Sequence, residues 1–116
     1  MLPKRERLAR EREIKGVIRT KQHTGRSPLL YLVAKDNNLQ FSRIAVVAPK
    51  RLGNSVERNR IRRRLRAVFA GLKQKMETCV DLVVYPQGGL SRIGHGELVS
   101  SFMSALKKAR LLDRYA

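Results

Sequence analysis

The chain has 116 residues, and its 26 Lys and Arg against 9 Asp and Glu give a formal net charge of +17. A compact protein of this size repels itself at such a charge, which indicates a polyanionic partner whose counterions are released on binding. Hydrophobic residues make up 42% of the sequence, which excludes a wholly disordered chain and predicts one domain over residues 1–116.

The sequence gives no sign of a membrane as that partner. No apolar run approaches the roughly eighteen residues of a membrane-spanning helix. The segment MLPKRERLAREREIKG lacks the apolar stretch and the cleavage site that are typical of a signal peptide. The single cysteine, Cys79, cannot form an internal disulfide and fits a reducing compartment. We therefore expect a cytoplasmic protein without a membrane partner.

The first 48 residues contain one predicted helix and two predicted strands. Apolar residues at helical spacing predict a helix over residues 7–20, in which Ile14 and Ile18 belong to the buried stripe. Short apolar runs predict strands over residues 29–34 and 41–48. Because an Asp-Asn-Asn turn separates these two runs, we expect them to pair as a hairpin.

The second half predicts a long helix, a strand and a last helix. Asn54 and Glu57 have the spacing of a capping box, so a helix should begin there and continue to about Lys75. An apolar run predicts a strand over residues 80–85, and an amphipathic pattern predicts a helix over residues 97–110. Intermixed helices and strands predict a small α/β sandwich with helices packed on one sheet.

The long helix carries six arginines within the nine residues from Arg58 to Arg66, with no acidic residue among them. On a helical wheel its apolar stripe, roughly 100° wide, consists of Ile61, Leu65, Val68, Phe69 and Leu72. The opposite side carries Asn59, Arg62, Arg63 and Arg66, with Arg60 and Arg64 on a flank and Arg58 nearer the stripe. Guanidinium groups bind phosphate bidentately and stack on bases, so this face predicts contact with RNA or DNA.

The segment Lys50–Arg66, KRLGNSVERNRIRRRLR, makes the prediction specific. It closely resembles the signature of the bacterial ribonuclease P protein component, which has two basic residues, a Gly-Asn pair, a small residue and Val, Arg-Asn-Arg, and then spaced basic residues. Order and spacing match without a gap. The resemblance extends to the family's first helix, to its first long strand at residues 26–31, to its last strand at 80–85 and to its C-terminal helix at 97–111.

The resemblance implies a fold and a function. The fold is α/β (an α+β two-layer sandwich) like the second domain of ribosomal protein S5, with about four strands, a left-handed βαβ crossover and helices at both ends of the chain. The function is that of the protein subunit of ribonuclease P, an endoribonuclease that removes the 5′ leader from precursor tRNA. The family implies a one-to-one complex with a catalytic RNA, which performs the hydrolysis with bound Mg²⁺, so no catalytic residue or metal ligand is expected in the protein.

The resemblance also assigns residues. The RNA-binding surface would comprise Lys50, Arg51, Gly53, Asn54, Arg58, Asn59, Arg60, Arg62, Arg63 and Arg66. A cleft for the single-stranded leader would lie between the sheet and the first helix, lined by Ile14, Ile18 and Tyr31. The family usually has aromatic residues where this chain has Ile14 and Ile18, and often a basic residue after the last strand, where this chain has Pro86 and Gln87.

Three other classes of protein share some of these features. A ribosomal or other structural RNA-binding protein would have the same composition but would not require the ungapped Lys50–Arg66 pattern. A DNA-binding factor of the basic-zipper type would need apolar heptads after the basic helix, and none follow. A protein-only nuclease would need clustered metal ligands, whereas His23 and His95 have no Cys or carboxylate at ligand spacing.

Overall fold

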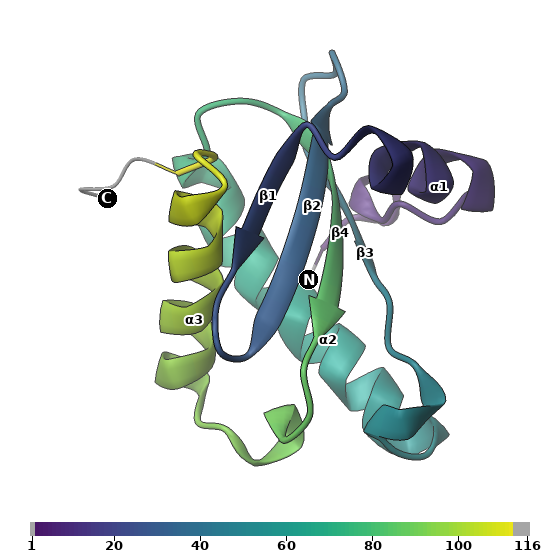
Figure 1. Cartoon of the computed structure of the whole chain (residues 1–116), viewed down its shortest axis with the longest axis vertical. Helices are drawn as coiled ribbons and strands as arrows, with labels where there is room; N and C mark the ends of the chain where they lie inside the picture. The colour runs from purple at the N-terminus through teal and green to yellow at the C-terminus, as the bar shows by residue number, and fades with distance from the viewer. Residues whose placement is uncertain (1, 113–116) are drawn as a thin grey trace.

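The computed structural model describes residues 2–112, which form a four-stranded sheet and three helices (Figure 1). In chain order the elements are α1 (Glu11–Thr20), β1 (His23–Arg26), β2 (Leu30–Asp36), β3 (Arg43–Val46), α2 (Ser55–Leu72), β4 (Val80–Pro86) and α3 (His95–Lys108). Short 3-10 turns lie at Lys4–Glu6, Lys50–Leu52, Lys73–Lys75 and Leu90–Arg92. Helices near both ends of the chain confirm that part of the expected architecture.

The strand order is β1-β2-β4-β3. The pairs β1–β2 and β2–β4 are antiparallel, whereas β3 and β4 are parallel and joined through α2. In Figure 1, β3 and β4 both run downward, β3 lies to the right of β4, and α2 passes behind the sheet. This crossover is therefore left-handed, as the resemblance implies, although about 98% of such connections are right-handed.

The predicted hairpin between residues 29–34 and 41–48 is wrong. Strand β4 lies between β2 and β3, so the two strands are not neighbours. All but one of the seven residues of β4 are apolar, and a continuous apolar strand is suited to the centre of a sheet that is covered on both faces. The Asp-Asn-Asn turn is therefore part of a connection from β2 to β3 that crosses the end of β4, and it does not form a hairpin.

Strand β1 was not predicted, because its sequence, HTGR, lacks an apolar run. Pairing with β2 from His23↔Ala34 to Arg26↔Tyr31 stabilises it instead. The expected strand at residues 26–31 therefore contains the turn between β1 and β2.

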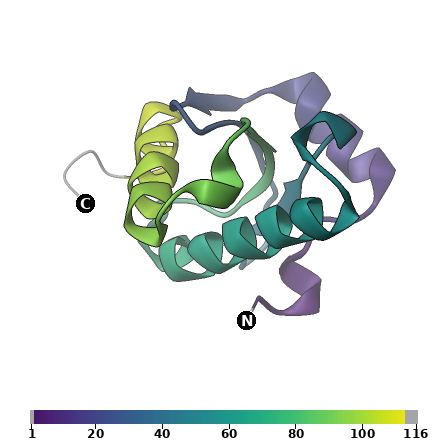
Figure 2. The same cartoon turned by 90° about the horizontal axis from the view of Figure 1, so that it is seen from below.

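Two apolar clusters lie on opposite faces of the sheet. Helices α2 and α3 cover one face, where Phe69 and Phe102 pack against alternate strand residues such as Leu32 and Leu82. Helix α1 lies over part of the other face, as Figure 2 shows from below. The second cluster consists of Leu8, Val17, Val33, Ala45 and Val83. Helix α1 lies across one end of this face (Figure 1), and Tyr31 and Tyr85 on the same face are only partly buried, so we call this part of the sheet the open face.

Helix α1 begins at Glu11, four residues later than residue 7 of the prediction. The preceding segment extends the sheet beside β3, since Leu8 N–H donates to the carbonyl oxygen of Ile44 at 2.8 Å. Leu2 and Glu6 are buried, and the Glu6 carboxylate accepts a hydrogen bond from Lys73 at the end of α2. These contacts hold the N-terminal segment against both β3 and α2.

An ion cluster connects α1 to the sheet. Arg43 donates to both carboxylate oxygens of Asp81, at 2.8 and 2.6 Å, and also to Glu13 of α1 at 3.0 Å. Asn37 donates a further hydrogen bond to Asp81 at 3.0 Å. The hydrogen bonds to Asp81 raise the pKa of Arg43 above its already high ordinary value, so the guanidinium stays charged. This cluster fixes α1 over one end of the sheet.

The close approach of β1 to α3 depends on a glycine. A Cβ atom at Gly25 would lie 2.0 Å from the carbonyl oxygen of Ala105. We expect Gly25→Ala to lower the free energy of unfolding by roughly 2–3 kcal/mol, because α3 must shift to accept the methyl group. Denaturant unfolding measures this. The control is Gly71→Ala in α2, where a Cβ would meet nothing within 4 Å and should add up to about 1 kcal/mol. Equal stability of the two variants would contradict the packing.

Candidate nucleic-acid interface

Helix α2 begins with the predicted capping box. Glu57 N–H donates to the Asn54 side-chain oxygen at 2.9 Å, and the Glu57 carboxylate accepts from the Asn54 N–H at 3.4 Å. Gly53 precedes the cap with a φ of 134°, a conformation that favours glycine. The loop that contains Lys50 and Arg51 is therefore fixed relative to the start of the helix.

The two faces of α2 match the helical wheel. Its buried residues are Ile61, Leu65, Val68, Phe69 and Leu72, as predicted. Of the predicted RNA-binding residues on the helix, Asn59, Arg60 and Arg63 are exposed, whereas Arg58, Arg62 and Arg66 are half-buried. Of the half-buried arginines, Arg62 donates a hydrogen bond from its Nη1 to the Asn59 side-chain oxygen at 2.9 Å.

A groove of about 520 Å³ runs between α2 and the N-terminal segment. Its lining residues are Leu2, Arg7, Asn59, Arg62, Arg63, Arg66 and Ala67. Arg7 was not predicted, because only the packing of the N-terminal segment brings it beside α2. Arg7 was the first residue of the helix predicted over residues 7–20, and nothing in that pattern indicated a partner in α2.

The groove is electrostatically unfavourable as it stands. Burial lowers the pKa of Arg66, and the positive charges of Arg7 and Arg62 lower it further. Among the described residues, the Nε atoms of Arg7 and Arg66 are buried without a hydrogen-bond partner. An anion in the groove would relieve both the charge repulsion and the unpaired donors.

Arg64 differs from its neighbours. Its Nη1 and Nη2 atoms donate to the carbonyl oxygens of Leu90 and Ile93, each at 2.7 Å. These bonds hold the connection between β4 and α3 against α2. The helical wheel placed Arg64 on a flank but could not identify this contact, because the acceptors lie 26 and 29 residues later in the sequence, in and just after a 3-10 turn.

The predicted leader-cleft residues gather on the open face of the sheet. Ile14 and Ile18 of α1 and Tyr31 of β2 all pack against the same apolar cluster. Tyr85 of β4 lies directly opposite Tyr31, with ring centroids 5.9 Å apart and ring planes 26° from parallel. The Arg26 guanidinium lies 4.7 Å from the centre of the Tyr31 ring. Tyr85 and Arg26 were not predicted as members of this site.

The structure contains no cluster of three or more His, Cys, Asp or Glu side chains suited to a metal ion within residues 2–112. His23 instead lies 3.0 Å from the Asp36 carboxylate. Over the same part of the chain, none of the helices combines the length and the apolar character that crossing a membrane would require.

The mixed sheet, the left-handed crossover and the arginine-lined helix define a small α/β protein of the nucleic-acid-binding class. A model of the family described as Ribonuclease P matches residues 2–110. The chain therefore belongs to the bacterial ribonuclease P protein component family. It is a subunit of ribonuclease P, the endoribonuclease that processes the 5′ end of tRNA, and membership implies association with the ribonuclease P RNA. The activity of this family generally needs Mg²⁺.

Individual relatives are similar over almost their whole length. The ribonuclease P protein component of Enterococcus faecalis is 28% identical over 113 residues, which cover 97% of this chain and 95% of the relative. That of Syntrophomonas wolfei is 30% identical over 117 residues, covering 100% and 97%.

Solved structures agree in fold. The RNase P protein of Staphylococcus aureus superposes with a TM-score of 0.81 at 20% identity, covering 93% of this chain and 98% of that one. The RNase P protein of Thermotoga maritima gives a TM-score of 0.78 at 23% identity, covering 88% and 96%.

The contacts of Arg64 predict a stability effect that its neighbour lacks. We expect Arg64→Met to lower the free energy of unfolding by about 1–2 kcal/mol, because two carbonyl groups lose a charged donor. Arg63→Met is the matched control: the side chain is exposed, so its loss should change stability by less than about 0.5 kcal/mol. Thermal or denaturant unfolding of both variants checks this, and similar values for the two would argue against an anchoring role for Arg64.

Proposed function

We propose that this subunit binds the ribonuclease P RNA, one protein to one RNA, through α2 and the loop before it, and that it also contacts precursor tRNA. The observation that carries the proposal is the groove that Arg7, Arg62 and Arg66 line together, with no acidic residue among its described lining residues. The proposed RNA-binding surface comprises Arg7, Lys50, Arg51, Gly53, Asn54, Arg58, Asn59, Arg60, Arg62, Arg63 and Arg66.

Phosphate groups of a folded RNA fit the chemistry of this surface. A guanidinium group presents paired N–H donors that match two phosphate oxygens, and Arg62 is oriented by a 2.9 Å hydrogen bond to Asn59. The first turn of α2 adds backbone N–H groups and the positive end of the helix dipole. Partial burial strengthens each of these interactions relative to water, because the local dielectric constant is lower.

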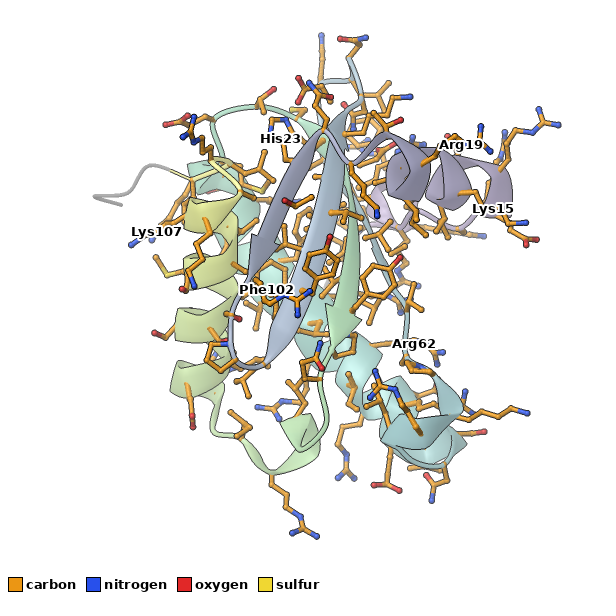
Figure 3. The ribbon with its side chains drawn as sticks, viewed as in Figure 1. Lys15, Arg19, His23, Arg62, Phe102 and Lys107 are labelled. Atoms are coloured by element: carbon orange, nitrogen blue, oxygen red, sulfur yellow. The ribbon has the colours of Figure 1, made fainter. Side chains whose placement is uncertain are left out.

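The open face of the sheet is the proposed site for the single-stranded 5′ leader. Ile14 and Ile18 form its α1 wall, and Tyr31 lies on its floor. Arg19 projects from α1 into solvent and offers positive charge to a passing phosphate chain (Figure 3), whereas the Lys15 ammonium is paired with Glu11 at 3.0 Å. Contact with both the catalytic RNA and the leader would tighten substrate binding without any protein side chain in the chemical step.

Mg²⁺ belongs, in this proposal, to the RNA subunit and the substrate, which supply its oxygen ligands and perform the hydrolysis in the cytoplasm. The protein's cations neutralise phosphate charge that would otherwise need additional metal ions. The complex should therefore work at lower Mg²⁺ concentrations than the RNA alone.

Charge reversal tests the arginine groove. Arg62→Glu with Arg66→Glu should weaken binding to ribonuclease P RNA and flatten its salt dependence. Each lost phosphate contact should reduce the slope of the logarithm of the binding constant against the logarithm of the salt concentration by something under one unit. Binding is measured by filter retention or fluorescence anisotropy across a salt series.

The control is Lys107→Glu with Lys108→Glu, the same charge change on α3, which lies well away from Arg62 in Figure 3. This control should lower affinity far less. If both double variants flatten the slope equally, only total charge matters and the groove is not the binding site.

Reconstitution tests the function as a whole. The protein, combined with ribonuclease P RNA at an Mg²⁺ concentration too low for the RNA alone, should restore cleavage of a precursor tRNA at the 5′ end of the mature tRNA. The product is identified by its length and by its 5′-phosphate. Folded protein that binds the RNA but leaves low-Mg²⁺ cleavage unchanged would overturn the proposed assistance.

A further inference from the structure

We propose that Tyr85 is a base-stacking residue of the leader site, and that it forms with Tyr31 and Arg26 a platform for unpaired nucleobases on the sheet. This inference rests on the proposed function of the open face. It goes further by extending base recognition from α1, where the family usually has aromatic residues, to Tyr85 of β4, a residue that the sequence analysis did not assign to the site.

Arg26, Tyr31 and Tyr85 form a continuous row across three strands. Arg26, Tyr31 and Tyr85 lie on adjacent strands in the register Arg26↔Tyr31↔Tyr85, so their side chains share one face of the sheet. The tyrosine rings are 26° from parallel at 5.9 Å, and the Arg26 guanidinium is 4.7 Å from the Tyr31 ring centre. A row of two near-parallel rings and one guanidinium plane is the kind of surface on which successive bases stack.

The row lies where the strands emerge from beneath α1. On the same face, two residues away, the pair Val33↔Val83 lies beneath α1 and is fully buried. Tyr31 and Tyr85 occupy the next pair toward the open end and are only half-buried. A merely structural pair here would need no more than the aliphatic side chains found beneath α1, whereas partly exposed rings offer π-faces to a ligand.

The row supplies both the π-faces and the positive charge that a single-stranded nucleic acid requires. Ile14 and Ile18 of α1 provide apolar contact but no π-face, so stacking must come from the tyrosine rings on the sheet. The exposed Arg26 offers a positive charge to the phosphate that follows a stacked base. Burial raises the pKa of Tyr85, and Tyr31 raises it further, so the phenol remains neutral and does not repel phosphate at physiological pH.

A leader-dependent binding cycle tests the inference. The reconstituted complex of protein and ribonuclease P RNA is titrated with precursor tRNA that has an intact leader, with versions that have one abasic nucleotide at each leader position in turn, and with leaderless tRNA. Wild type should lose about five- to tenfold in affinity at one abasic position. With the intact leader, Tyr85→Leu should bind about five- to tenfold more weakly than wild type. Removing the base at the sensitive position should not weaken the variant further. Leaderless tRNA should bind the variant and wild type with equal affinity. Tyr85→Phe keeps the ring and should behave as wild type.

The outcomes separate this inference from the proposed function. If wild type binds the RNA and distinguishes leader from no leader, but Tyr85→Leu has the wild-type profile, the inference is wrong and the leader site stands. A loss by Tyr85→Leu that is equal with and without a leader would reveal a structural role and also overturn it. If wild type fails to bind ribonuclease P RNA or to distinguish the leader, the proposed function fails and this inference fails with it.

Discussion

Helix α2 buries Ile61, Leu65 and Phe69 against the sheet, and the rest of the structure depends on this contact. It fixes the rotation of the helix about its axis, so Asn59 and Arg63 must face outward. It also holds the crossover that places β4 beside β3, and through β4 it fixes the floor of the open face. One apolar stripe therefore determines both the proposed RNA-binding surface and the site proposed for the leader.

The same packing concentrates positive charge where water is partly excluded. Arg66 loses hydration on α2 and lies beside the guanidinium groups of Arg62 and Arg7. Elsewhere the protein neutralises buried charge internally, as Asp81 and Glu13 do for Arg43. The two sites therefore differ: Asp81 and Glu13 neutralise Arg43, whereas no acidic residue is among the described residues that line the groove of Arg7, Arg62 and Arg66. Arg64, which is bound to two carbonyl oxygens, belongs with Arg43.

Local patterns in the sequence predicted the elements whose physics is local. The two faces of α2, its Asn54–Glu57 cap and the apolar strand β4 all followed from spacing within a few residues. The predicted hairpin failed because strand pairing is a choice between distant partners, and β4 satisfies both β2 and β3 better than they would satisfy each other. Arg7 and Tyr85 were missed for the same reason: nothing near either residue in the sequence shows that it will lie beside Arg66 or Tyr31.

The central place of β4 also has a consequence for the order of folding. When β2 and β3 have emerged from the ribosome, each of them still has an unpaired edge. Strand β4, which pairs with both, follows α2 in the sequence and is synthesised later. The sheet therefore closes only once about three quarters of the chain has emerged, as residues 80–86 become available. Until then the nascent chain exposes two strand edges, which are prone to pairing with other chains. The net charge of +17 opposes such pairing between copies of the chain, because like charges repel one another.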